Sequence, residues 1–320
     1  GKPFRGLFPG AASLAVAQDR IEEKTFFQRC GLSVQSFAAV DDEPSLAAAL
    51  RHVPLPALLK TRRFGYDGKG HARVDAPEDA LEAWRSLGEV PCILESFVPF
   101  VREVSILAVR GRDGRVLCWP LTENVHVRGI LSTSRVPATD ATALEQAARR
   151  HVTAVAEALS HVGVLAIEFF VVEGESGLQL VANEMAPRVH NSGHCTIEGS
   201  VTSQFENHLR AIMGLPLGDT GLRGDAATMV NLIGSRPDPA QVFAVTGAAL
   251  HDYGKSPRPG RKLGHVTVAG DAAAVAAASR RLAPFAPGGG LPDLDSIGRG
   301  HHGAAPETSH AGRDAEPGSP

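Results

Sequence analysis

Residues 60–71, Lys-Thr-Arg-Arg-Phe-Gly-Tyr-Asp-Gly-Lys-Gly-His, interleave three glycines with cations directly after a short apolar run. Glycines let backbone N–H groups approach a polyanion, and Lys60 and Lys69 supply positive charge, so this segment could hold nucleotide phosphates. The segment matches neither the Walker A pattern nor the dinucleotide-binding glycine pattern. A glycine-rich hairpin tip with solvated lysines is the alternative, and this segment alone does not decide between the two.

Glu168 and Glu184 each follow an apolar run, and we expect them on the two strands of one hairpin. Both carboxylates could project from the same face of a sheet. Such a pair suits Mg²⁺, which proteins commonly hold with one or two carboxylates together with substrate phosphates. On spacing alone, two exposed or separately paired glutamates are the alternative.

Residues 183–194 hold an acid, an arginine, two histidines and two asparagines within twelve positions. Such density directly after a strand is typical of a loop that carries a site on a rigid scaffold. Arg188 could bind a phosphate or a carboxylate through two parallel hydrogen bonds. His190 and His194 have the spacing of a helical zinc site, but a nearby proline and glycine disfavour a helix, so we expect no zinc there.

Residues 251–265 place four cations within eight positions, namely Lys255, Arg258, Arg261 and Lys262. Together they could form a local anion site, with a solvated basic loop as the alternative. No serine lies in a GxSxG nucleophile pattern, and no cysteine–histidine pairing stands out. Nucleophilic acyl transfer is therefore disfavoured.

The elements that must position these residues are short helices and strands. A helix is expected from Asp19, with Glu22 completing a capping-box pattern, to Gly31. Further helices are expected at 78–87, 139–161 and 201–213, strands at 55–59, 92–95, 227–233 and 266–268, and hairpins at 103–119 and 164–184. Residues 1–17 are expected to be an irregular lead-in. The pattern predicts an α+β fold with mixed sheets and hairpins.

Composition narrows the classes of function. The chain has 320 residues, of which 43% are hydrophobic and 21% charged, and a net charge of −3, so neither a nucleic-acid nor a membrane partner is expected. No apolar run is long enough to span a bilayer, and no signal-peptide layout opens the chain. The four cysteines show no metal-binding or disulfide spacing, which predicts a cytoplasmic protein.

Taken in order, five segments resemble N5-carboxyaminoimidazole ribonucleotide synthase, the ATP-grasp carboxylase family of purine biosynthesis. They are residues 18–24, 64–71, 95–98, 183–194 and 253–265, within a span from about residue 14 to residue 268. The last two segments are long and specific.

The resemblance implies an ATP-grasp fold, with two mixed α+β subdomains clasping the nucleotide, followed by a small β-rich C-terminal domain. We expect a linker or remnant of the family's N-terminal domain at 1–17, the ATP-grasp domain at 18–215, the C-terminal domain at 216–286, and a disordered tail at 287–320. The family's Rossmann-like N-terminal domain finds no match in this sequence. Since the first residue is Gly1, a fragment of a longer protein is expected.

The resemblance also implies ATP and Mg²⁺ as cofactors and assigns residues to them. Nucleotide binding is assigned to Arg20, Lys60, Tyr66, Asp67, Gly68, Lys69, Gly70, His71, Glu95, Ser96, Phe97, Val98, Glu103, His126, Asn183 and Glu184. Glu168 and Glu184 are assigned to the metal. Arg188, His190 and Lys255 are the catalytic candidates, and Arg188, Lys255, Arg258 and Lys262 are the candidates for substrate binding.

In the implied reaction, ATP phosphorylates bicarbonate to carboxyphosphate, which delivers CO₂ to the exocyclic amine of 5-aminoimidazole ribonucleotide. Phosphoryl transfer of this kind needs positioning, metal and cations more than covalent help from the protein. A homodimer is implied as well. Two alternatives remain open: another ATP-grasp ligase, such as a formate-dependent purine transformylase, and a non-catalytic ATP-binding remnant. The basic segment 253–265 favours the carboxyaminoimidazole ribonucleotide synthase over another ATP-grasp ligase, since the acceptor side separates these families.

Overall fold

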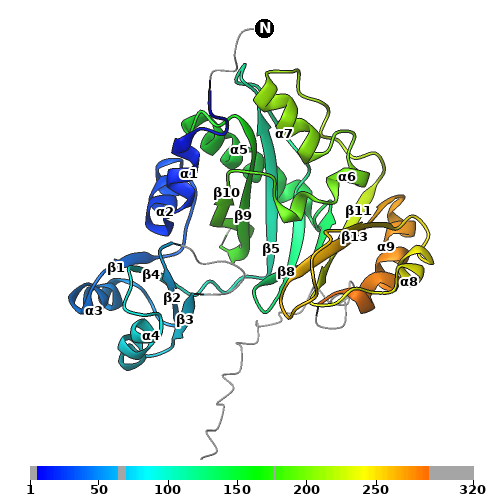
Figure 1. Cartoon of the computed structure of the whole chain (residues 1–320). Helices are drawn as coiled ribbons and strands as arrows, with labels where there is room; N and C mark the ends of the chain where they lie inside the picture. The colour runs from blue at the N-terminus through cyan, green and yellow to red at the C-terminus, as the bar shows by residue number, and fades with distance from the viewer. Residues whose placement is uncertain (1–5, 64–69, 176, 288–320) are drawn as a thin grey trace, which may run out of the picture.

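Two β-sheets organise the chain, which the computed structural model describes at residues 6–63, 70–175 and 177–287. The smaller sheet has the strand order β1-β4-β2-β3, and every neighbouring pair is antiparallel. Its strands are β1 (Phe37–Val40), β2 (Ala57–Thr61), β3 (His71–Val74) and β4 (Cys92–Ser96). The helices α3 (Glu43–His52) and α4 (Ala80–Ser86) pack on it around a core that includes Leu46, Leu59 and Trp84 (Figure 1).

The larger sheet has nine strands in the order β10-β9-β5-β7-β8-β11-β13-β12, with β6 paired to β5. Its strands are β5 (Arg102–Arg110), β6 (Val116–Cys118), β7 (Thr122–Val127), β8 (Ile130–Val136), β9 (Gly163–Gly174), β10 (Gly177–Ala186), β11 (Ala226–Ile233), β12 (Ala249–Asp252) and β13 (Lys262–Gly270). Helix α5 (Ala141–Ala158) buries Leu144, Val152 and Val155 in the main core on this sheet.

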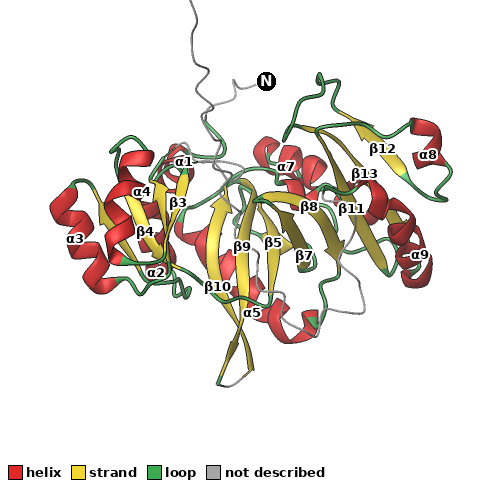
Figure 2. Ribbon diagram, turned by 90° about the horizontal axis from the view of Figure 1, so that it is seen from below, coloured by secondary structure: helices red, strands yellow, loops and turns green. Residues whose placement is uncertain are grey.

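The C-terminal part of the chain continues the larger sheet instead of building a separate one. β11 pairs antiparallel with β8, so that Ala227 lies opposite Val136. Helices α8 (Pro239–Phe243) and α9 (Ala272–Leu282) close a distinct apolar core on β11 and β13. Figure 2 shows α9 against β11 and β13, far from the smaller sheet.

Most of the predicted elements are present, with shifted ends. Helix α2 (Arg20–Arg29) begins after Asp19, and Gly31 has a positive φ of 78° at its end, as predicted. Asp19 accepts a hydrogen bond from the N–H of Ile21, and the predicted capping box with Glu22 is not formed. The prediction of an irregular lead-in at residues 1–17 was wrong in part, because α1 (Ala11–Ala17) is helical. The predicted tail lies outside the described residues from 288 onward.

The remaining helices are short. They are α6 (Thr196–Gly199) and α7 (Gln204–Met213), with 3-10 turns at Pro77–Asp79, Asn191–Gly193 and Ala283–Phe285. In the described part of the chain, no helix combines the length and apolar character needed to cross a membrane.

The β9–β10 hairpin contains a β-bulge at Asn183. On one side of it Ala182 lies opposite Phe169, and on the other Glu184 lies opposite Glu168. Ala182 and Met185 both face the main core, although strict alternation would send residues three apart to opposite faces. The extra residue therefore lets both apolar side chains stay buried while Glu184 turns to the same face as Glu168.

Two neighbouring residues of α2 satisfy the backbone of β10 at this bulge. β10 is an edge strand, whose outward polar groups need partners. The buried ammonium of Lys24 donates to the carbonyl of Ala182 at 3.1 Å and to that of Asn183 at 2.6 Å. Glu23 Oε1 accepts from the N–H of Met185 at 2.7 Å. Helix α2 thus holds the bulge from outside the sheet.

Replacing Lys24 should destabilise the fold. Lys24→Met leaves two buried carbonyls without their donor, and removing one partner of a buried charged network costs about 3 kcal/mol. We expect urea denaturation to show a loss of this size. Arg29→Met is the matched control, since Arg29 is exposed on the same helix, and it should shift the unfolding free energy by no more than about 0.5 kcal/mol. Equal stability of the two variants would contradict the role given to Lys24.

Candidate nucleotide and metal site

A cavity of about 730 Å³ collects most of the described candidate residues. Its lining comes from both sheets and from α2, with Lys60 on β2, Arg20 on α2 and Glu168 on β9. The predicted site residues that line it are Arg20, Lys60, Gly70, His71, Glu103, His126, Glu168, Asn183, Glu184, Arg188, His190 and Lys262. Residues predicted from seven separate stretches of sequence therefore meet in one place.

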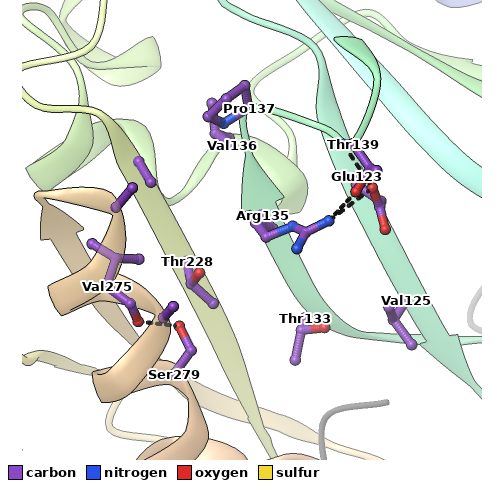
Figure 3. A pocket seen from close by; sticks show the side chains of 13 residues that line it. Glu123, Val125, Thr133, Arg135, Val136, Pro137, Thr139, Thr228, Val275 and Ser279 are labelled. Atoms are coloured by element: carbon purple, nitrogen blue, oxygen red, sulfur yellow. Dashed lines mark hydrogen bonds and ion pairs between the residues drawn. The ribbon is translucent and has the colours of Figure 1, made fainter. Parts of the chain in front are cut away.

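A second cavity, of about 310 Å³, lies between α9 and the strands β7, β8 and β11 (Figure 3). Arg135 of β8 donates a hydrogen bond to Glu123 of β7 in this cavity. Their neighbours along the strands, Ser134 and Asn124, point to the opposite face of the sheet. None of the predicted site residues lines this cavity. The larger cavity is therefore the candidate site.

Glu168 and Glu184 lie directly opposite each other across the hairpin, which confirms the predicted geometry. Residues in such register have Cβ atoms about 5 Å apart, and two like charges there repel unless a cation compensates them. His190 Nε2 lies 3.1 Å from Glu168 Oε1, and the Arg20 guanidinium lies 3.5 Å from Glu184 Oε2. Burial raises the pKa of Glu168, but the hydrogen bond from His190 and nearby cations bring it down to about 2.

This pair fits Mg²⁺. Among the residues that the structure describes, no group of three or more His, Cys, Asp or Glu could hold a metal by itself. Mg²⁺ does not need such a group, because it takes one or two carboxylates and completes its shell with water and substrate phosphates. Two facing carboxylates, beside the cations Arg20 and Lys60 that suit phosphates, meet that requirement.

Glu103 and His126 form a second polar pair in the cavity, with 2.7 Å between Oε2 and Nδ1. Burial alone would lower the pKa of His126. The hydrogen bond and the charge of Glu103, with Glu168 and Glu184 beyond it, raise this pKa to about 9. His126 is therefore an imidazolium at neutral pH in the metal-free protein, and it adds a positive charge beside three carboxylates.

Lys60 is held by Glu95, whose Oε2 lies 2.5 Å from the ammonium. Glu95 is 1% exposed, and Lys24 lies 3.7 Å from its other oxygen. Burial raises the pKa of Glu95, but Lys60 and Lys24 lower it to about 2. Glu95 orients Lys60 from behind and does not itself line the cavity.

Several predicted residues are not brought to this cavity. Glu95 and Ser96 at the end of β4 do not line it, and neither do Phe97 and Val98, which follow this strand. Lys255 and Arg258 do not line it either. Lys255 lies over the ring of Tyr253, with 5.2 Å from Nζ to the ring centre. Tyr66, Asp67, Gly68 and Lys69 lie outside the described residues.

Sequence reasoning missed Glu23, which lines the cavity one helical turn from Arg20. Burial and the charge of Glu184 raise the pKa of Glu23 to about 8, so that this side chain is largely protonated at neutral pH. It also missed Arg62 and Arg63, which line the cavity and form ion pairs with Asp19. The spacing of Arg20 and Glu23 on one helix face was the available signal.

The fold and this cavity define an ATP-grasp enzyme. A model of the ATP-grasp domain matches residues 25–205, and a model of the phosphoribosylaminoimidazole carboxylase C-terminal domain matches residues 227–279. The chain belongs to the N5-carboxyaminoimidazole ribonucleotide synthase family.

Named relatives support this assignment along most of the chain. The N5-carboxyaminoimidazole ribonucleotide synthase of Pseudomonas aeruginosa is 51% identical over 265 residues, covering 83% of this chain and 72% of the relative. The synthetase structure from Thermus thermophilus is 52% identical with a TM-score of 0.82, covering 90% of this chain and 77% of that one. An Aspergillus clavatus synthase, solved with ADP and 5-aminoimidazole ribonucleotide, is 28% identical with a TM-score of 0.77, covering 91% and 76%.

The Glu103–His126 pair predicts a pH-dependent contribution to stability. Because folding raises the pKa of His126 from 6.5 to about 9, the contribution is fully present below pH 6.5 and is lost as the pH rises through about 9. Without Mg²⁺, wild type should lose up to about 3 kcal/mol relative to His126→Gln over this window, by urea denaturation. Glu103→Gln should remove the same dependence. Parallel curves for wild type and His126→Gln would contradict it.

Proposed function

We propose that the cavity between the two sheets is where this chain performs the reaction of its family. The chain is an ATP-grasp ligase of purine biosynthesis that makes N5-carboxyaminoimidazole ribonucleotide from 5-aminoimidazole ribonucleotide, ATP and bicarbonate. The observation that carries the placement is the Glu168–Glu184 pair, which lines a single cavity together with Arg20 and Lys60.

On the nucleotide side, Lys60 and Arg20 bind the phosphates of ATP, and Glu168 and Glu184 hold Mg²⁺. When bound, the ion neutralises charge that develops on the transferred phosphoryl group. The Lys60 side chain is already oriented in the absence of ATP, since its ammonium lies 2.5 Å from Oε2 of Glu95. Asn183 lies at the bulge beside the same carboxylates. We assign the ribose contact to Glu103, which His126 orients.

On the acceptor side, Arg188, His190 and Lys262 share the cavity wall and give it positive or donor character. Arg188 is exposed there, which leaves its guanidinium accessible to an anion. Bicarbonate and the phosphate of the ribonucleotide are the anions that we assign to this end. Lys255 and Arg258 lie on the connection from β12 to β13, which leads into the cavity at Lys262. We assign them to the same substrate.

The proposed magnesium ligands predict a specific loss of turnover. With ATP, Mg²⁺ and bicarbonate, release of ADP should be stimulated by 5-aminoimidazole ribonucleotide. Glu184→Gln should lower this stimulated rate at least about 100-fold, since it weakens metal and transition-state stabilisation together. Coupled detection of ADP measures both rates.

The control is Glu173→Gln, an exposed glutamate farther along β9, which should keep the wild-type rate. ATP binding without stimulation by the ribonucleotide in the wild type would favour a non-catalytic nucleotide-binding remnant. Stimulated turnover that survives in Glu184→Gln would contradict the metal site. Absence of ATP binding would contradict the placement of the whole site.

We also propose that the chain forms a homodimer and acts in the cytoplasm. Helix α7 exposes Phe205, Leu209 and Met213 at intervals of four residues, so that they share one face. An exposed apolar stripe of this kind is typical of an interaction surface. All four cysteines are free, which suits a reducing compartment.

The α7 face makes the dimer testable. Leu209→Lys places a charge in the middle of the apolar stripe and should convert the dimer to a monomer in light scattering. Arg210→Ala, a change at the next residue of the same helix, should leave the mass unchanged. A wild-type monomer, or a Leu209→Lys dimer, would contradict the proposed interface.

A further inference from the structure

Two consecutive arginines in the wall of the larger cavity share one buried carboxylate. Arg62 and Arg63 both line this cavity, and both pair with Asp19, which is 2% exposed and precedes α2. Arg62 makes a two-pronged contact, with 2.9 Å from Nη2 to Asp19 Oδ2 and 3.1 Å from Nε to Oδ1. Arg63 makes a single contact, with 3.2 Å from Nε to Oδ2.

The two guanidinium groups differ in what they leave for a ligand. Arg62 donates through Nε and Nη2 to Asp19 and through Nη1 to Asp41, at 3.3 Å, so each nitrogen of its guanidinium meets a carboxylate. Arg63 is bound through Nε alone, and among the described residues its Nη nitrogens make no hydrogen bond. Its side chain is also 59% exposed. Arg63 therefore keeps the N–H groups of both Nη nitrogens for an anion.

The position of Arg63 at the cavity wall is fixed from two sides. The backbone N–H of Arg62 donates to the carbonyl of Pro91 at 3.0 Å, and the carbonyl of Arg62 accepts from the N–H of Arg20 at 3.1 Å. Arg63 thus follows a residue whose backbone is tied both to the segment before β4 and to α2. Since Asp19 also binds Nε, the direction of the Arg63 guanidinium is set at both ends of its side chain.

The positive charge of Arg63 is only partly compensated. Burial raises the pKa of Asp19, but the hydrogen bonds from Arg62 and Arg63 bring it below its usual value, so this carboxylate is ionised at neutral pH. Its single charge serves two guanidinium groups, and Arg62 takes the larger share through two hydrogen bonds. Lys60 and Arg20 add positive charge to the same cavity. Such a wall favours an anion with more than one negative charge, which describes a phosphate better than bicarbonate.

We propose that Arg63 is a phosphate-binding residue of this cavity, with its guanidinium oriented by Asp19. A guanidinium presents parallel N–H donors that match two oxygens of one phosphate group. The phosphate belongs to the nucleotide or to the ribonucleotide, which carry the same chemistry. This inference rests on the proposed function, since it takes the cavity as the place where both substrates bind.

Calorimetric titration without turnover tests the proposal with two probes. The first is AMP-PNP, a non-hydrolysable analogue of ATP, with Mg²⁺. The second is 5-aminoimidazole ribonucleotide, added to protein that already holds ADP. Arg63→Met should weaken the binding of one probe at least about tenfold, the size expected when hydrogen bonds to a charged group are lost. It should leave the affinity for the other within about threefold. The probe that is weakened identifies the source of the phosphate.

Arg85→Met is the matched control. Arg85 on α4 has a similar exposure, 56%, and also pairs with carboxylates, those of Glu43 and Glu89, but it does not line the cavity. This variant should bind both probes as the wild type does. Wild-type affinity for both probes in Arg63→Met would overturn the proposal. An equal loss in Arg85→Met would overturn it too, as would a loss of both probes together with a lowered melting temperature in Arg63→Met.

The dependence on salt separates a charge contact from structural damage. The difference in affinity between wild type and Arg63→Met should shrink as the ionic strength rises from about 0.05 M to about 0.5 M, since salt screens an exposed charge. A difference that does not change with salt would overturn the proposal. A wild type that binds both probes but shows no stimulated release of ADP would contradict the proposed function, and the titrations would still decide the role of Arg63.

Discussion

The single extra residue in β10 is the constraint on which the site depends. Without the bulge at Asn183, the partner of Glu168 would be Asn183, and Glu184 would lie opposite Ile167 on the core face. A buried carboxylate in an apolar core is so costly that this register would not persist. The bulge resolves the conflict, because the core keeps Ala182 and Met185 and the cavity gains a second carboxylate. Lys24 and Glu23 stabilise the bulge by binding the backbone around it.

Helix α2 connects this local geometry to the rest of the cavity. Arg20 of this helix contacts Glu184. One turn further on, the ammonium of Lys24 binds the backbone of the bulge and lies 3.7 Å from Oε1 of Glu95 in the smaller sheet. Glu95 in turn holds Lys60. The two sheets are therefore joined through charges that alternate in sign, and neither sheet could shift without breaking a buried contact. We infer that Lys60 and the carboxylate pair keep a constant position relative to each other before any ligand is present.

Local chemistry made much of this predictable. Asp19 and Gly31 mark both ends of α2, because capping and left-handed backbone depend on residues near in sequence. The hairpin carrying Glu168 and Glu184 followed from two apolar runs around a polar turn.

The pairing of β11 with β8 could not be predicted in this way, since it joins residues about 90 positions apart and no local pattern encodes such a pairing. Glu23 was missed because only the tertiary structure shows that its helix covers the bulge. Helix α1 was missed because short apolar segments carry weak periodicity.

The contacts around the two carboxylates differ in strength, and this difference bears on how the proposed site would accept Mg²⁺. Arg20 touches Glu184 at 3.5 Å, and the Glu184 side chain is 45% exposed, so this ion pair is weak and easily exchanged. Glu168 is 14% exposed and lies 3.1 Å from Nε2 of His190, whose Nδ1 lies 2.8 Å from the hydroxyl of the buried Ser192. One carboxylate is thus fixed in place, and the other is free to turn. In the proposed magnesium site, Glu168 would fix the position of the cation, and the movable Glu184 would exchange Arg20 for the cation and leave the guanidinium to the phosphates.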